Sequence, residues 1–558
     1  MRSRWFDAFW LLAFGLASSA WCLTATAELG PTFDEPLYLN AGLTSWRTGS
    51  NKLLMSAGTM PLPVDVQTLP IYLWEQQRGS AFHAYRDIST ILPVARAANL
   101  GFWWLLLFYT MRLGRTGGGR WGGRIATALI ACEPNFLGHA ALATTDIALV
   151  AAMLALVYHY HHGQDNGWCR RVLVPGFCFG IAMLAKASGM VFGVQAMLVL
   201  GLCRLGRRGE LTAPAGSSSL EKFSHLWHAG FPLRKDLAGI ALIGFTLVFA
   251  YTGSDWGTEW TFIEWAEQLP EGTLRGLMVP ASHNLAIFPN AGEALLQQVK
   301  HNLRGHGAFI LDEWHEKAYW AYFPIALSIK TPAPVLALLL AVLMIRPRNL
   351  ATPLGAIVLV LFVFSLNCRV QIGIRFMFTL MALLNIALAA AAARTWADPG
   401  GGRFVPRWFV GAMLAVMAGT SAWVWPHGIS FVNQLWGGTQ DGYRRLSDSN
   451  YDWGQGLPEL KAWNAAKNAG EPIAVAYFGT DPAILLPPFK AINLYYMLHA
   501  GTPEELRRVC GSRYLAVSTS VLYGAETDRG SHVAALRHLR SLDPIGRTPT
   551  FLIFDLAR

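Results

Sequence analysis

The chain of 558 residues is 53% hydrophobic and only 14% charged, with a formal net charge of +10. Several unbroken apolar stretches reach the length of about 20 residues that crosses a bilayer, which excludes an ordinary soluble multidomain protein. The basic excess does not point to nucleic acid as a partner, because lysines and arginines collect in the cytoplasmic loops of membrane proteins.

The apolar stretches predict eleven membrane-spanning helices. The first runs from Trp5 to Leu23; it has no clear small-residue cleavage site and more spans follow it, so we expect a retained anchor. The other stretches begin near Pro93, Arg124, Thr144, Val172, Gly189, Leu237, Trp320, Pro353, Ile374 and Trp408. An odd number of spans places the two ends of the chain on opposite sides of the membrane.

The basic residues predict which side is which. Lysines and arginines in short loops resist translocation, and with a cytoplasmic N-terminus the basic clusters at 112–124, 204–208 and 346–348 all lie in the cytoplasm. We therefore expect a multi-pass protein of the cytoplasmic (inner) membrane. Three long segments then lie outside: residues 25–92, residues 253–319 and the tail from about 426 onward.

The tail differs from the rest of the chain. It contains a helical stretch around 457–469 and short β-rich runs at 473–478, 514–518 and 551–554, which is typical of a small α/β domain. The predicted fold class is an α-helical polytopic membrane protein with a small soluble C-terminal α/β domain. We expect residues 1–425 to form a transmembrane domain and residues 426–558 to form an extracytoplasmic domain.

Two acidic sites are predicted near the outer face of the membrane. Asp34 and Glu35 follow the first span in a turn bracketed by prolines, and Asp146 opens the fourth span. Charges near lipid are costly unless they are paired or lie in a watery cavity, so these carboxylates favour a functional site. The simpler interpretations are a solvated loop pair at 34–35 and, at Asp146, an acid that stabilises the N-terminus of a helix.

Two cations are predicted on the same side. A tight turn within the apolar stretch 172–205 places Lys186 at the outer face, and Arg375 begins the helix after the outer turn 367–375. Either cation can bind phosphate, and the fork of a guanidinium suits phosphate well. The alternatives are that Lys186 snorkels to the interface and that Arg375 forms a salt bridge to one of the three outer acids.

Acids and cations at the outer surface suit an enzyme that acts on an anionic lipid, since a carboxylate can take the acceptor's proton while cations stabilise a leaving phosphate. ATP-driven chemistry is not supported, because no GxxxxGK[ST] motif is present. The seven cysteines include no CxxC pair, and the histidine-rich stretch 159–162 is typical of an interfacial polar cap. This histidine-rich stretch is therefore not expected to be a metal site.

A set of short motifs follows in order along the chain. They are Phe33-Asp34-Glu35-Pro36 with Tyr38, Pro134-Asn135-Phe136-Leu137-Gly138-His139 followed by Thr144-Thr145-Asp146, Leu184-Ala185-Lys186, Arg304-Gly305-His306, Tyr319-Trp320-Ala321-Tyr322-Phe323-Pro324 followed by Lys330-Thr331-Pro332, Gly373-Ile374-Arg375-Phe376, and Asp448-Ser449-Asn450-Tyr451-Asp452-Trp453-Gly454-Gln455. Their order and membrane placement resemble the GT-C superfamily of polyprenyl-phosphate-sugar-dependent glycosyltransferases, in particular bacterial relatives of protein O-mannosyltransferases and of the lipid A aminoarabinose transferase. The resemblance extends along most of the chain.

The resemblance implies a GT-C-like fold and an inverting transfer, in which an acceptor hydroxyl attacks the anomeric carbon of the sugar and the polyprenyl phosphate leaves. It implies that Asp34 is the base, that Glu35 positions the acceptor or supports the base, and that Asp146 is the second acid. The expected ligands of the donor phosphate are Lys186 and Arg375, followed by Arg304, Lys330 and Arg369. The expected contacts of the acceptor or sugar are Tyr38, His139 and His306. No obligatory metal cofactor is implied, although some members of the superfamily need a divalent ion.

Two other classes of protein stay open. A transporter or flippase of lipid-linked sugars also needs many spans and a basic cavity, but it predicts polar residues at mid-membrane and often related halves, and the sequence contains no duplicated half. A noncatalytic envelope assembly factor predicts that a change at Asp34 leaves function intact. For a transferase, the acceptor hydroxyl can belong to a protein, a lipid or a glycan.

Overall fold

Helices form most of the chain, as seen in a computed structural model that describes residues 2–212, 217–254, 257–286, 290–397, 404–496, 502–524 and 534–557. In chain order the helices before the C-terminal region are α1 (Arg2–Glu28), α2 (Glu35–Thr48), α3 (Lys52–Ser56), α4 (Leu62–Arg78), α5 (Ile88–Ala131), α6 (Pro134–Ala140), α7 (Asp146–Gly163), α8 (Val174–Ala185), α9 (Ser188–Arg207), α10 (Ser219–Ala229), α11 (Phe231–Thr252), α12 (Trp260–Glu267), α13 (Thr273–Asn284), α14 (Ala291–Arg304), α15 (Tyr322–Lys330), α16 (Ala333–Ile345), α17 (Pro353–Ser365), α18 (Phe378–Ala397) and α19 (Arg407–Trp423). A short antiparallel ribbon, β1 (Ala308–Ile310) and β2 (Glu313–His315), lies between α14 and α15, and the 3₁₀ turn η3 (Ile374–Met377) precedes α18.

Four of the described helical segments are long and apolar enough to cross a membrane: Trp5–Glu28, Ile88–Ala131, Ser188–Arg207 and Ile374–Trp396. A fifth span results if α15 and α16, which meet at a bend of 105°, count as one. The chain is therefore a multi-pass membrane protein, and the number of eleven spans stays a prediction. Some predicted spans correspond to shorter helices, since α8 has 12 residues and α17 has 13.

The 44-residue element α5 is two helical segments joined by a turn. Gly118 and Gly119 leave the helical conformation, and Gly119 has a φ of +62°, which glycine adopts without steric cost. A Cβ added to Gly114 would lie 2.7 Å from the carbonyl oxygen of Gly122. Residues eight positions apart are separated by about 12 Å along a straight helix, so the chain reverses direction between these two glycines.

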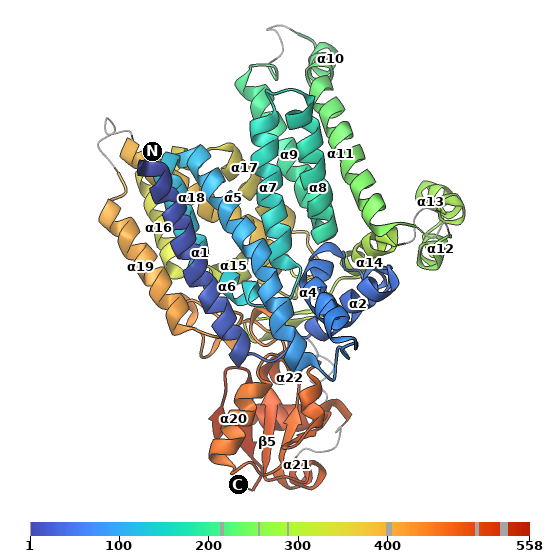
Figure 1. Ribbon diagram of the computed structural model, residues 1–558, viewed down its shortest axis with the longest axis vertical. Coiled ribbons are helices and arrows are strands. Elements are labelled where there is room, and N and C mark those ends of the chain that lie inside the picture. The colour runs from blue at the N-terminus through green and yellow to red at the C-terminus, as the bar shows by residue number, and fades with distance from the viewer. Residues whose placement is uncertain are drawn as a thin grey trace.

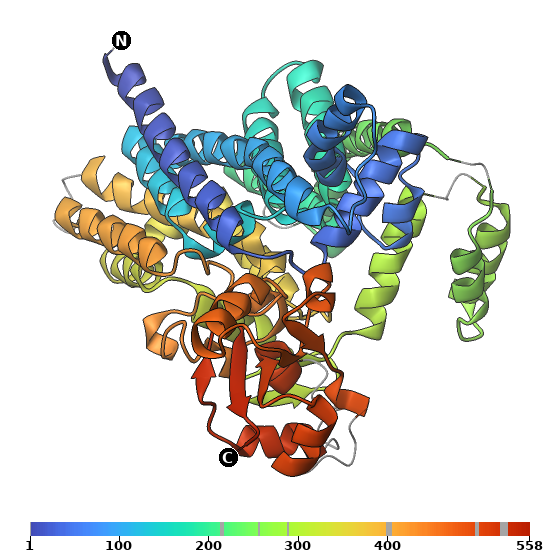
Figure 2. The same cartoon turned by 60° about the horizontal axis from the view of Figure 1, so that its bottom comes forward.

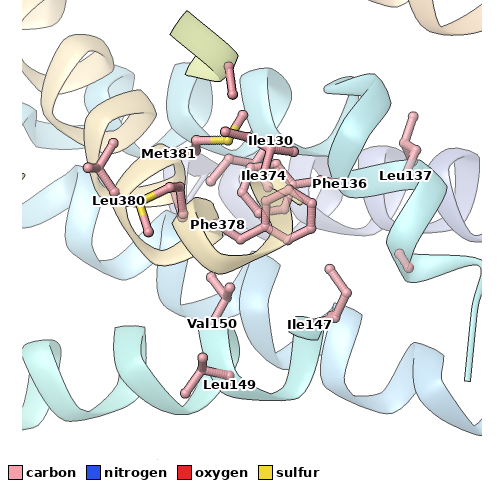
Figure 3. Close-up of a cluster of buried hydrophobic side chains, with 14 of the residues drawn as sticks. Ile130, Phe136, Leu137, Ile147, Leu149, Val150, Ile374, Phe378, Leu380 and Met381 are labelled. Atoms are coloured by element: carbon pink, nitrogen blue, oxygen red, sulfur yellow. The ribbon is translucent and has the colours of Figure 1, made fainter. Parts of the chain in front are cut away.

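The core of the helical part forms where α5, α6, α7 and α18 meet. Figure 3 shows Phe136 of α6 beside Phe378 at the start of α18, with aliphatic side chains around them, and the two ring centroids lie 4.9 Å apart. α18 is almost entirely buried because its alanines let neighbouring helices approach closely. At the contact with the turn in α5, for example, Ala390 packs against Gly118.

The C-terminal region contains a five-stranded sheet in the order β4-β3-β5-β7-β6 (Figure 2). Its elements are α20 (Leu457–Lys467), β3 (Ile473–Ala476), β4 (Phe489–Ala491), α21 (Pro503–Cys510), β5 (Tyr514–Ser518), α22 (Thr519–Tyr523), α24 (Ala534–Ser541), β6 (Gly546–Arg547) and β7 (Phe551–Asp555). β3 runs parallel to β4 and β5, whereas β7 runs antiparallel to β5 and β6. The three predicted β-rich runs are confirmed as strands β3, β5 and β7, and Figure 1 shows this region at one end of the molecule. That it is a separate soluble domain stays a prediction.

The segment 448–455 joins the C-terminal region to the helical part. The backbone N–H of Phe33, in the first predicted outer loop, donates a hydrogen bond to the carbonyl oxygen of Trp453 at 2.8 Å. The N–H of Ile374 in η3 donates to the side-chain oxygen of Asn450, also at 2.8 Å. Two segments that lie more than 300 positions apart in the sequence are therefore held against the same eight residues.

Asp452 ties this segment to the sheet. Its carboxylate accepts hydrogen bonds from the Thr519 hydroxyl at 3.2 Å and from the Ser520 N–H at 3.0 Å, both just beyond β5. Burial raises the pKa of Asp452 to about 6, even though these hydrogen bonds favour the charged form.

Candidate active site

The first ion pair of the candidate site joins Asp34 to Arg375. Asp34 immediately precedes α2, and Arg375 lies in η3; their Oδ2 and Nη1 atoms are 3.2 Å apart. Tyr38, one turn along α2, donates its hydroxyl to the same Oδ2 at 3.4 Å. The side chain of Asp34 keeps 25% of its surface exposed, whereas that of Arg375 keeps 8%. The Asp34 carboxylate is therefore the most accessible of these three side chains.

The second carboxylate, Asp146, lies on the other side of Arg375. It is the first residue of α7, and its side chain is fully buried. Its Oδ1 accepts a hydrogen bond from Lys186 Nζ at 2.6 Å, and its Oδ2 lies 3.7 Å from Arg375 Nη1. The structure thus brings together the two acids and two cations expected from the sequence. Lys186 does not snorkel to the interface, because its ammonium group pairs with Asp146.

Aromatic rings cover both cations. The guanidinium carbon of Arg375 lies 4.2 Å from the ring centroid of Trp453, and Lys186 Nζ lies 4.5 Å from that of Phe376. Such contacts stabilise a partly desolvated cation by about 0.5–2 kcal/mol. Arg375 Nε and Asp146 Oδ2 are buried without a hydrogen-bond partner, although buried polar atoms are normally paired. The cluster therefore keeps unused hydrogen-bonding capacity at its centre.

His139 lies at the inner edge of the cluster. It is in α6, is buried, and its Nδ1 lies 3.8 Å from Asp146 Oδ2. Its ring packs edge-on against Phe378, with 4.7 Å between centroids. Its distance to Asp146 is beyond hydrogen-bonding range, so His139 shapes the wall behind the carboxylate.

A third carboxylate, Asp448, belongs to the same electrostatic environment, and sequence reasoning missed it as a site residue. The pKa of Asp448 is raised to about 6, chiefly by burial and also by the charge of Asp34, while the charges of Arg375 and His306 act in the opposite direction. Its φ of +56° lies in the left-handed region, which few residues other than glycine adopt. The available signal was the 448–455 motif, which also supplies Trp453.

Glu35, next to Asp34 in sequence, faces a different way. Both of its oxygens accept hydrogen bonds from Arg96, at 2.7 and 2.8 Å, and they also accept from the backbone of Thr32 and Ala143, each at 2.8 Å. Burial raises the pKa of Glu35, but the charge of Arg96 and these hydrogen bonds outweigh it and hold the pKa below its usual range. Glu35 therefore holds the turn that contains Asp34 against the turn that contains Asp146.

Lys330 also lies apart from the ion-pair cluster. Its buried ammonium group donates to the carbonyl oxygens of Ile429 and Asn450, each at 2.7 Å. Both acceptors are backbone groups, and Asn450 belongs to the segment that joins the C-terminal region to the bundle. The position of Lys330 therefore indicates that it supports that segment and does not contact a ligand.

Arg304, His306 and Arg369 lie together on the loop side of the site. Both arginines are exposed, and the N–H of His306 donates to the carbonyl oxygen of Arg369 at 3.0 Å. Arg369 Nη1 lies 3.4 Å from the carbonyl oxygen of Leu303. These residues border the site but do not join the ion pairs of Asp34 and Asp146.

An apolar cavity of about 240 Å³ adjoins the two cations. It begins at Ala187 and Ser188, directly after Lys186, and reaches Phe376 and Met377, directly after Arg375. Its remaining lining is mostly apolar and comes from α9, α14, α15, α17 and the turn after α17: Met190, Val191, Phe192, Leu295, Gln298, Val299, Asn302, Leu303, Phe323, Phe364, Cys368 and Val370. The ion-pair cluster thus lies next to a hydrophobic cavity.

Within the described part of the chain, no group of three or more His, Cys, Asp or Glu side chains has the arrangement of a metal site.

One solved structure that is similar to this chain is ArnT from Cupriavidus metallidurans bound to undecaprenyl phosphate. The two sequences are 12% identical, the match covers 98% of this chain and 97% of that chain, and the TM-score is 0.45. The Archaeoglobus fulgidus oligosaccharyltransferase shows 11% identity, coverage of 96% and 72%, and a TM-score of 0.45. The S. cerevisiae protein O-mannosyltransferase Pmt1-Pmt2 complex bound to the sugar donor shows 16% identity, coverage of 44% and 33%, and a TM-score of 0.31.

No curated protein matches the chain in sequence. A match does exist to a protein family: residues 87–214 fit the family of dolichyl-phosphate-mannose-protein mannosyltransferases. This range contains Asp146 and Lys186, two of the four residues in the ion-pair cluster. The resemblance to polyprenyl-phosphate-sugar-dependent glycosyltransferases that the motifs indicated is therefore confirmed by the family match over residues 87–214.

Proposed function

We propose that this chain is an inverting glycosyltransferase that moves a sugar from a polyprenyl-phosphate donor to an acceptor hydroxyl at the outer face of the membrane. The observation that carries the proposal is the position of Arg375 between Asp34 and Asp146, next to Lys186 and beside the apolar cavity. A polyprenyl-phosphate sugar has the matching parts: a hydrocarbon chain, an anionic phosphate and a sugar.

Lys186 and Arg375 are the proposed ligands of the donor phosphate. Two acids and two cations make the cluster neutral, and the leaving phosphate gains negative charge as its bond to the sugar breaks. Fixed cations stabilise that charge most strongly in a site that excludes water. The unpartnered Nε of Arg375 supports this role, because a guanidinium can donate two parallel hydrogen bonds to phosphate. The adjoining cavity receives the start of the hydrocarbon chain.

Asp34 is the proposed base. Its carboxylate takes the proton of the acceptor hydroxyl while the acceptor oxygen bonds to the anomeric carbon and the bond from that carbon to the phosphate oxygen breaks. The phosphate leaves with the electron pair, and a single displacement inverts the anomeric centre. A phosphate on Arg375 competes with Asp34 for the same guanidinium, so donor binding frees the base. This exchange links occupation of the donor site to activation of the acceptor.

The remaining predicted residues take supporting roles in this proposal. Asp146 holds Lys186 in place and orients the sugar, and Glu35 keeps the two acidic turns together. Arg304 and Arg369 are proposed as further ligands of the donor phosphate, His139 and His306 as contacts of the acceptor or sugar, and Tyr38 orients Asp34.

The proposed catalytic unit is residues 1–425, with outer loops at 25–92 and 253–319, and it uses the 448–455 segment of the extracytoplasmic region 426–558. Trp453 supports the inclusion of that segment, because its ring lies against Arg375. A catalytic unit that lacks residues 448–455 is expected to be inactive.

The proposal is tested by the release of polyprenyl phosphate from a panel of polyprenyl-phosphate sugars, with native membrane extract as the source of acceptors. Wild-type protein is compared with Asp34→Asn and with Asp165→Asn, a change to an exposed acid in the loop after α7, far from Asp34 in sequence. Release that depends on Asp34 but not on Asp165 supports the proposal. Equal release by the wild type and Asp34→Asn, or none with any donor from folded protein, would overturn it.

A further inference from the structure

A second cavity lies between the ends of five helices and takes no part in the proposed transfer. Its volume is about 210 Å³. α5, α7, α9, α17 and α18 all contribute to its wall. In Figure 1 the ends of these helices that line the cavity are the ends farther from the C-terminal sheet. They lie on the predicted cytoplasmic side. The cavity is therefore at the opposite end of the bundle from the Asp34 cluster.

The polar lining of this cavity is basic. Arg207, Arg394 and His161 line it together with Thr116 and Thr352, and no Asp or Glu of the described segments does. Among the described residues, neither Arg207 nor Arg394 forms an ion pair with a carboxylate. Arg394 donates to the backbone oxygen of Asn349, and its Nε is buried without a hydrogen-bond partner. The cavity thus presents positive charge that the protein itself does not neutralise.

The acids beside the end of α9 are already engaged, and Glu210 lies 3.7 Å from Arg208. Asp165 accepts from Arg204 at 2.7 Å and from Arg208 at 2.5 Å, the neighbours of Arg207 at the end of α9. Within the described residues, the hydrogen bond of Arg207 is a long one, from its Nε to the carbonyl oxygen of Cys203 at 3.3 Å. α17 begins here, but α7, α9 and α18 end here and helix C-termini carry partial negative charge, so the positive charge of the cavity comes from its arginines.

The lining changes character with depth. Leu113, Val157, Leu200 and Ala387 line the cavity from the same four helices as the polar groups, three to seven residues earlier. At a rise of 1.5 Å per residue, these apolar side chains lie about 5–10 Å further into the bundle. Cations at the helix ends and apolar groups toward the middle match the order of a phospholipid, in which the charged head group precedes the acyl chain.

We infer that this cavity binds the phosphate head group of an anionic phospholipid from the surrounding bilayer, with Arg207 and Arg394 as its ligands and the apolar wall against the start of an acyl chain. The cationic lining favours an anionic head group over a zwitterionic one. Lipid bound here would hold the ends of α5, α7, α9 and α18 together, so it should also stabilise the fold.

Native mass spectrometry of the full-length protein in detergent tests this site. The probes are phosphatidylglycerol, phosphatidylcholine with the same acyl chains, and inorganic phosphate. We expect phosphatidylglycerol to be retained most strongly, and Arg207→Ala or Arg394→Gln to weaken its binding about tenfold, the loss of one charge-assisted hydrogen bond. The matched control is Arg120→Ala, an exposed arginine in the second segment of α5 that does not line the cavity.

Arg207→Ala keeps the test decisive even if Arg394→Gln does not fold, because Arg207 is exposed. Equal retention of the two lipids, or equal loss in Arg207→Ala and Arg120→Ala, would show that the arginines only cap helix ends and would overturn the inference. Displacement of the phosphatidylglycerol by millimolar inorganic phosphate would also overturn it, because the site would then take a free anion. Sugar transfer is not measured in any arm, so the result is independent of the proposed enzyme activity.

Discussion

Arg375 and Asp34 lie 341 positions apart in the sequence, and their side chains form an ion pair at 3.2 Å. This contact joins the first loop after α1 to the turn before α18, and Asp146 approaches the same guanidinium nitrogen to within 3.7 Å. An arginine shared by two carboxylates is held in place before any ligand arrives. In the proposed mechanism an incoming phosphate displaces one of them, and the more exposed Asp34 is the partner that can move.

Replacement of Arg375 by lysine keeps the charge but removes the planar fork that stacks on Trp453. We expect the KM for the donor to rise roughly 10- to 100-fold, which corresponds to the loss of one charge-assisted hydrogen bond, and kcat to fall as well, because Arg375 also stabilises the charge of the leaving phosphate. Initial-rate kinetics with varied donor concentration measure this. Arg120→Lys, at an exposed arginine in the second segment of α5 that has no part in the proposed site, is the control. An unchanged KM in Arg375→Lys would remove this residue from the donor site.

Glu35→Gln should affect stability before it affects catalysis. The substitution leaves the charge of Arg96 buried without its partner, a change that costs about 3–5 kcal/mol in other proteins. We expect a clear fall in Tm for Glu35→Gln and little change for Glu28→Gln, whose side chain is exposed. If Glu35 instead contacts the acceptor, Tm stays constant while the KM for the acceptor rises.

Stability should depend on pH through Asp448 and Asp452. Both have a pKa near 6 in the folded protein, above the value of about 4 in an unfolded chain. The folded protein therefore binds these protons more readily, and the free energy of unfolding should rise as pH falls from above 6 toward about 4.5. At still lower pH, protonation of Glu35, whose pKa is lowered, breaks its ion pair with Arg96. The free energy of unfolding then falls as the pH falls further.

Thermal unfolding across pH 4.5 to 7.5 measures this effect, and Asp448→Asn should flatten the profile. A wild-type Tm that falls steadily from pH 7 to pH 5, or an Asp448→Asn profile identical to that of the wild type, would show that Asp448 does not carry the raised pKa.

The sequence was sufficient to predict that Asp34, Asp146, Lys186 and Arg375 lie near one another. Each comes directly before or after an apolar stretch, so their side of the membrane follows from the order of the spans. The same reasoning could not separate these residues from Lys330, because the direction of a side chain depends on packing. The ammonium group of Lys330 turns toward two carbonyl oxygens.

The role of the tail was predicted only in part. Three strands follow from their β-branched and aromatic residues, but β4 and β6 have only three and two residues and give no clear pattern. Asp448 and Trp453 were assigned to an outer domain, and their approach to Arg375 depends on backbone hydrogen bonds of the 448–455 segment, such as that from Phe33. Contacts of this kind, between segments distant in the sequence, leave no local signal.

The most direct test of the account is the binding of polyprenyl phosphate to Asp34→Asn, measured beside its transfer rate. If donor phosphate and Asp34 compete for Arg375, the variant should bind polyprenyl phosphate at least as tightly as the wild type, while transfer falls by about 100-fold or more because the base is lost. Weaker binding together with a normal transfer rate would contradict both the shared arginine and the catalytic base.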